Sequence, residues 1–324
     1  MSTLALRGPA RVVVLQHRRA LWIAGALALA GIVLLTASVW WNSGTADTYA
    51  DSGCSYLDSS PRCLAAFDDM LSHQAWLRDV LRYAGTAMMV LPAAIGLFVA
   101  GPLIGRELES GTYRLSWSQS VSPARWLLAK LTVPATITLV AVSVLTAVFA
   151  WSRTSPDTDR LAWYDTSTYA AMGTLPTASA LFAIALGALV ALLVRRTLLA
   201  MGITALAYGA VALALGAVRS SLWAVTTVVT PLNATPTGLP GSTLFVGSGL
   251  MAGEQRLPGE TCYRNPVPEG VDRCLADHHV TGTYTDFHPA SHFWPLQLVE
   301  TGIVLVLAAA AAAVAFRVLR RSHG

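Results

Sequence analysis

Six long apolar stretches constrain this chain more than any other feature of its sequence. They cover residues 21–41, 83–105, 131–151, 171–194, 197–218 and 293–316, and they contain a single charged residue, Glu300. A helix of about 20 residues crosses the roughly 30 Å hydrocarbon core of a bilayer, at a rise of about 1.5 Å per residue. Only 12% of the residues are charged, against about a quarter in an ordinary soluble domain. The sequence therefore predicts an all-α polytopic membrane protein with six transmembrane helices, in which residues 1–324 form one transmembrane domain.

The first stretch could also be a secretory signal peptide, because a basic segment precedes it. However, it is longer than the apolar region of a usual signal peptide, and no A-x-A-like cleavage site follows it. We therefore interpret residues 21–41 as a retained first span.

The loops between the predicted spans fall into two sets of different charge. The N-terminus, residues 106–130, the Arg195-Arg196 pair and the C-terminus together hold 13 of the 22 Lys and Arg residues, but two of the 18 acidic residues. The other set consists of the loops 42–82, 152–170 and 219–292. Because basic residues stay on the cytoplasmic side, we expect both termini in the cytoplasm and these three loops outside. The basic residues lie at the ends of apolar stretches, so nucleic-acid binding is not expected.

All four cysteines fall in the predicted outer loops, where an oxidising environment permits disulfides. They form two pairs that are close in sequence, Cys54/Cys63 and Cys262/Cys274. Four cysteines allow three pairings, and we predict the two local ones because each would staple a separate loop. Four free thiols are the alternative.

The sequence lacks the residues that ATP hydrolysis would need. A Walker loop places a lysine after a glycine-rich turn, whereas the single lysine, Lys130, follows Leu-Leu-Ala. Catalytic groups do not converge at membrane depth either, which disfavours an integral-membrane enzyme. His288 and His292 are four residues apart, but their spacing matches no closed ligand pattern, and we predict no metal site. The sequence thus predicts a protein that is not an enzyme and has no cofactor of its own.

Residues 106–130 form a charged segment between the second and third predicted spans. Glu107 and Glu109 are the only acidic residues in the predicted inner loops. Ser122-Pro123 is typical of a helix start, with serine as N-cap and proline at the first helical position. The segment is therefore a candidate docking surface for a cytoplasmic partner. The alternative is local charge balance with neighbouring arginines, which contributes about 0–1 kcal/mol per surface pair.

Two motifs suggest a family. Residues 106–115 read R-E-L-E-S-G-T-Y-R-L and are followed by S-V-S-P-A-R-W and Lys130; residues 289–297 read P-A-S-H-F-W-P-L-Q. The first motif resembles the R-E-x-E-x-G-T…S-x-x-R…K segment of export-type ABC transporter permeases, especially the small six-span permeases of high-GC bacteria. The second is similar to a P-A-S-R-F-W-P-x-Q stretch that enters the last span of that family. This chain departs from the family at His292, where arginine is expected, and at Pro123, where many relatives carry arginine.

The resemblance implies a permease subunit in a bacterial plasma membrane. In that family the segment between the second and third spans is a coupling helix that docks on a separate ATPase subunit, which binds ATP and Mg. The permease pairs with a second copy, as a homo- or heterodimer, and exports a substrate. The fold would also place re-entrant helices in the broken stretch 220–253. The residues to which the motif assigns coupling are Arg106, Glu107, Glu109, Gly111, Thr112, Arg114 and Arg125.

Glu300 is the one ionisable residue inside a predicted span. A charge at the centre of a span costs about 2.5–3.5 kcal/mol on insertion scales, so such a residue usually faces a cavity or a partner. With Gln297 about one turn earlier, it is a candidate for a substrate path. The alternative is an acid that reaches the outer interface.

A second function, from a different class, also fits the pattern. A membrane sensor or scaffold could display the disulfide-stapled outer loops to an extracellular ligand and recruit a signalling partner through residues 106–130. The two hypotheses differ in the cytoplasmic partner, which is an ATPase for the exporter and a kinase or protease for the sensor.

Overall fold

The computed structural model describes residues 14–15, 18–55, 57–113, 122–154, 161–234, 238–263 and 268–323. The chain divides into two compact units. Met1–Ala214 and Gln297–Gly324 form the first, here called the membrane unit. Leu215–Leu296 forms the second, here called the sheet unit, which contains the whole of the predicted outer loop 219–292.

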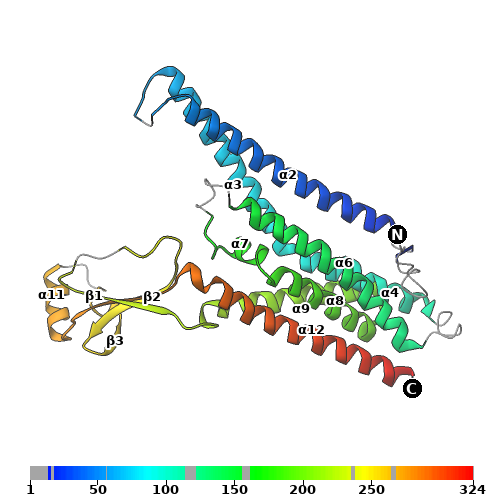
Figure 1. Cartoon of the computed structure of the whole chain (residues 1–324). Helices are drawn as coiled ribbons and strands as arrows, with labels where there is room; N and C mark the ends of the chain where they lie inside the picture. Colours follow the sequence, from blue (N-terminus) through cyan, green and yellow to red (C-terminus); the bar gives the residue numbers. More distant parts are fainter. Residues whose placement is uncertain are drawn as a thin grey trace. The chain divides into compact units, whose positions relative to one another are not determined.

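Within the described residues, six helices are long and apolar enough to cross a membrane, so the predicted number of spans is confirmed (Figure 1). The second predicted span is interrupted by a π-helical turn, η1 (Gly96–Ala100), between α3 and the short helix α4 (Gly101–Ser110). The fourth predicted span begins four residues late, because Gly173 has a left-handed backbone (φ 67°) between α7 (Thr166–Ala171) and α8. The long helices are α2 (Arg18–Asp51), α3 (Pro61–Ile95), α6 (Pro123–Ser152), α8 (Leu175–Val194), α9 (Thr197–Val218) and α12 (Phe293–His323).

The predicted outer loop 42–82 is mostly helical instead. The helix α2 has 34 residues, about 51 Å at 1.5 Å per residue, which exceeds the hydrocarbon core by roughly 20 Å. It lies beside α3, and the two helices form a long antiparallel hairpin (Figure 1). Polar residues 42–51 continue α2 because no proline interrupts them and the neighbouring α3 gives them a surface to pack on.

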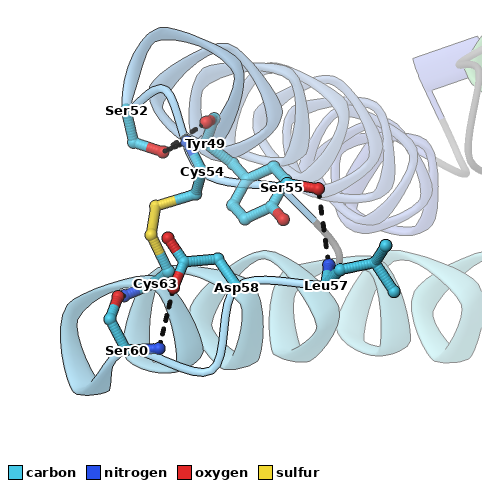
Figure 2. Close-up of a disulfide and its surroundings, with 8 residues drawn as sticks. All are labelled: Tyr49, Ser52, Cys54, Ser55, Leu57, Asp58, Ser60 and Cys63. Carbon is cyan, nitrogen blue, oxygen red and sulfur yellow. Dashed lines mark hydrogen bonds between the residues drawn. A yellow bond between two sulfur atoms is a disulfide. The ribbon is translucent and has the colours of Figure 1, made fainter.

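A disulfide closes the tip of this hairpin (Figure 2). Cys54 and Cys63 are bonded, with their Cα atoms 5.5 Å apart. Ser60 is the N-cap of α3 and accepts a hydrogen bond from the Cys63 amide at 3.4 Å, while Pro61 takes the first helical position. Tyr49 of α2 packs on Phe67 of α3, with 5.8 Å between ring centroids. The first of the two predicted pairings is therefore present.

The helix α8 is the most buried span of the membrane unit. It approaches η1 closely through small residues, because a Cβ on Gly187 would lie 2.8 Å from the Ala100 Cβ and one on Gly96 would lie 3.0 Å from the Ala183 Cβ. Small side chains at such crossings let backbones approach in a membrane, where dispersion contacts drive helix packing.

The sheet unit contains a four-stranded antiparallel sheet in the order β1-β4-β2-β3 (Figure 1). The short helices α10 (Glu260–Tyr263) and α11 (Pro268–Asp277) carry the second disulfide, Cys262–Cys274, which is the other predicted pairing. The 3₁₀ turns η3 (Arg219–Ser221) and η4 (Ala290–His292) also belong to this unit. The strands are β1 (Thr226–Pro231), β2 (Leu244–Ala252), β3 (Gln255–Pro258) and β4 (Gly282–His288).

This sheet corrects the expectation of re-entrant helices in residues 220–253, where the structure has β1 and β2. The run Thr-Thr-Val-Val-Thr in β1 is β-branched throughout, and such residues favour a pleated strand over a helix. The prolines and glycines that break the stretch lie mainly between the strands.

Candidate coupling site

The candidate coupling site lies where α4, the start of α6 and the connection between α8 and α9 meet, at the end of the membrane unit that is predicted to be cytoplasmic. The helix α4 ends at Gly111, whose φ of 73° is a left-handed conformation that favours glycine. Ser122 caps α6, as predicted, and accepts a hydrogen bond from the Arg125 amide at 3.4 Å. The end of α4 and the start of α6 are thus each fixed by a local interaction, the turn at Gly111 and the cap at Ser122.

The carboxylate of Glu107 joins α4 to α6. One oxygen accepts a hydrogen bond from the Lys130 Nζ at 2.6 Å, and the other accepts one from the Trp126 Nε1 at 3.0 Å. The Lys130 side chain is 5% exposed and that of Glu107 is 16% exposed. Trp126 and Lys130 are four residues apart and therefore lie on one face of α6. A largely buried ammonium needs such a partner, because an unpaired charge there would lose its hydration without compensation.

The carboxylate of Glu109 joins α4 to the start of α9. It accepts two hydrogen bonds from Thr197, from the backbone nitrogen at 3.0 Å and from the hydroxyl at 2.7 Å. It therefore caps α9 from a distant part of the chain, and a negative charge at this helix end is also favoured by the helix dipole. The contact is close, since a Cβ on Gly105 would lie 3.2 Å from the Thr197 Cα.

A shared apolar core supports these polar contacts. Its members come from five helices, α4, α6, α8, α9 and α12, which it packs together beneath the coupling segment. The fully or nearly fully buried members are Ile104, Leu127, Ala188, Ala191, Ala200 and Ala315.

The predicted coupling residues thus divide into two groups. Glu107 and Glu109 form hydrogen bonds to other helices of the membrane unit, although Glu109 is exposed. Arg106, Thr112 and Arg125 are exposed as well. Gly111 forms the turn that ends α4. Arg114 lies outside the described residues. The partners of the two glutamates were not identified from sequence, although the spacing of Trp126 and Lys130 on one helix face is a signal that could have found one pair.

Gln297 and Glu300 lie in the packed interior of the membrane unit. Gln297 is fully buried; its amide nitrogen donates to the Tyr169 carbonyl at 2.9 Å, and its amide oxygen accepts from the Leu175 amide at 3.2 Å. It therefore links α12 to α7 and to the first residue of α8. Glu300 is buried one turn later on α12. Their role in a substrate path stays a prediction.

The comparison with known families agrees with this arrangement. The sequence profile described as "ABC-2 membrane transporter related" matches residues 20–219, which is more than half of the chain. The matched region runs from α2 through α9 and includes the described part of the coupling site on α4, α6 and the α8–α9 connection. No curated protein matches the sequence. By this match the chain, a multi-pass membrane protein, belongs to the ABC-2 membrane transporter related family.

Proposed function

We propose that this chain is the transmembrane permease subunit of an ATP-driven exporter. A separate ATPase subunit binds ATP and Mg and docks on the candidate coupling site. The permease works with a second permease copy in a bacterial plasma membrane, with both termini in the cytoplasm. The family match supports a transport permease and does not favour the sensor hypothesis.

The observation that carries the proposal is the anchoring of α4 by two carboxylates. Glu107 bonds to α6 and Glu109 bonds to α9, so α4 is attached to two different spans at once. A force applied to α4 by a docked partner would therefore act on both spans and would not be absorbed in a loose loop. A coupling element needs this property, because allosteric coupling requires contacts that change together at the two sites.

The exposed face of the site has the chemistry of a docking surface. Arg106 on α4 and Arg125 at the start of α6 are exposed, and neither is needed for the two carboxylate anchors. A partner with acidic side chains at matching positions would form charge-assisted hydrogen bonds with them. We therefore assign docking to the exposed arginines and Thr112, and mechanical anchoring to the two glutamates.

The experiment is affinity purification of the tagged chain from a mild detergent, followed by identification of the co-purified proteins. We expect a stoichiometric protein with a Walker loop. Arg106→Glu should abolish its recovery, while Arg321→Glu, which changes an exposed arginine near the end of α12, should leave it unchanged. Recovery of the chain alone, or with a kinase, would refute the proposal.

A further inference from the structure

Two histidines of the sheet unit contact each other where its chain leads to the spans. His288 is the last residue of β4 and His292 the last of η4, and their Nδ1 atoms are 2.9 Å apart. The other ring nitrogen of His288, Nε2, lies 3.0 Å from the Ser220 carbonyl oxygen in η3. Along the chain, η3 directly follows α9 and η4 directly precedes α12. The His288 ring therefore joins the two segments through which the sheet unit is connected to α9 and α12.

These contacts determine where the protons of the two rings lie. A carbonyl oxygen can only accept, so Nε2 of His288 carries a proton and donates it to Ser220. A neutral His288 ring then has a bare Nδ1, which accepts a hydrogen bond from the protonated Nδ1 of His292. One proton thus lies between the two Nδ1 atoms. A separation of 2.9 Å leaves no room for a second proton, so the two rings in contact cannot both be imidazolium ions.

Burial also opposes a positive charge on the pair. His288 is fully buried, and burial disfavours the charged form of an imidazole. His292 is partly exposed, so the pair can exchange protons with solvent. The strands β1 and β2, which flank β4 in the sheet, contain no charged residue.

Neighbouring acids do not offset such a charge. Among the described residues of β4, η3 and η4, Asp286 is the one acidic residue. Its carboxylate already accepts hydrogen bonds from Arg256, at 2.9 Å, and from the Thr227 hydroxyl. Arg219, the residue before Ser220 in η3, is a further cation of this region. The surroundings therefore add to the repulsion that two imidazolium rings would feel.

We propose that His288 and His292 form a pH-sensitive clasp, defined as the contact between these two rings that holds η3 and η4 together. A free imidazole takes up a proton near pH 6.5. Once separated, both rings can be charged, whereas the closed clasp holds at most one charge. The open form therefore binds at least one proton more, and a fall in pH favours opening. This inference goes beyond the proposed function and does not rest on it, because it concerns the sheet unit alone.

The test is hydrogen exchange of the purified full chain in a detergent with an uncharged sugar head group, measured by mass spectrometry. Two amides report on the clasp: Leu222 donates to the Arg219 carbonyl at 3.1 Å in η3, and His292 donates to the Pro289 carbonyl at 2.9 Å in η4. After correction for intrinsic exchange, their protection should fall at least about tenfold between about pH 6.5 and about pH 5.0, the effect of one additional bound proton. Peptides from the centre of β4, around Thr285, should keep their protection.

Three variants assign the effect to the pair. His292→Asn places an amide near the position of Nδ1, and because an amide donates or accepts without titrating, protection should become nearly independent of pH. His292→Leu removes the partner of His288 and should lower protection already at neutral pH. His279→Asn is the matched control and should keep the pH dependence of the wild type. His279 is an exposed histidine of the sheet unit with a left-handed backbone (φ 50°), which asparagine tolerates.

Three results would overturn the inference. The first is equal protection of η3 and η4 in the wild type at both pH values. The second is a loss of protection in His292→Asn as large as in the wild type. The third is a loss that extends to the centre of β4, because acid would then unfold the whole sheet unit. A loss confined to η3 and η4, absent from His292→Asn and retained in His279→Asn, would confirm the clasp.

Discussion

The ion pair between Glu107 and Lys130 is the interaction on which the coupling site depends most, and it can be tested by a double-mutant cycle. The changes are Glu107→Ala, Lys130→Met and the two together. Methionine keeps most of the apolar length of lysine, so Lys130→Met removes the charge with little change in packing.

The expected magnitudes follow from burial. Lys130 is 5% exposed, so Glu107→Ala leaves a buried ammonium without a partner and should cost about 3–5 kcal/mol in the free energy of unfolding. Lys130→Met should cost less, about 1–3 kcal/mol, because the Glu107 carboxylate is more exposed and keeps its bond to Trp126. The double variant leaves no buried charge and should lie close to the less damaging single variant. The magnitude of the coupling energy is then close to the cost of Glu107→Ala, about 3–5 kcal/mol.

The assay is reversible unfolding in mixed micelles of a sugar detergent and sodium dodecyl sulfate, followed by far-UV circular dichroism. Each variant is titrated at the same protein concentration, and the free energies are compared at one detergent composition. Additive effects of the two single changes, with a coupling energy below about 0.5 kcal/mol, would refute the conclusion that the pair acts as one buried unit.

Three further predictions follow from other contacts. Removal of the distant cap by Glu109→Ala should lower the thermal midpoint of unfolding, and Glu109→Gln should lower it less, because its amide oxygen can still accept from Thr197; equal thermal midpoints of the alanine variant and the wild type would contradict this. Gln297→Leu should cost about 1–3 kcal/mol, measured by the same detergent titration, since a buried carbonyl and a buried amide lose their partner; a neutral effect would mean that water replaces it. Gly187→Val should lower the thermal midpoint strongly because its Cβ meets backbone as well as side chain, while Gly202→Ala, with open space, should not; similar midpoints would rule out the close crossing.

The spans were predictable because the thickness of the bilayer acts on each stretch locally. An apolar run such as 131–151 is long enough to cross the bilayer, so its span can be predicted without reference to the rest of the chain. The helical hairpin beyond the span was not predictable in the same way, because residues 42–51 are polar and their helix continues along α3. The sheet was missed because its strands are short and pair across long stretches of sequence, as Thr226 does with Phe287.

The acidic residues of the coupling site could be predicted from the sequence, but their contacts could not. Glu107 and Glu109 stood out because acidic residues are rare on that side, a property of composition alone. Their partners are 23 and 88 residues away, and the sequence does not show which distant donor meets a carboxylate. The acids therefore appeared as docking residues, while the structure uses them to fix α4 in place.

The burial of Lys130 also determines how this subunit responds to amine-directed chemistry. It is the only lysine in the chain and is held by Glu107, so acylating reagents and amine cross-linkers find no accessible ε-amino group on the folded protein. Acylation of Lys130, measured by mass spectrometry, would therefore indicate that α4 separates transiently from α6.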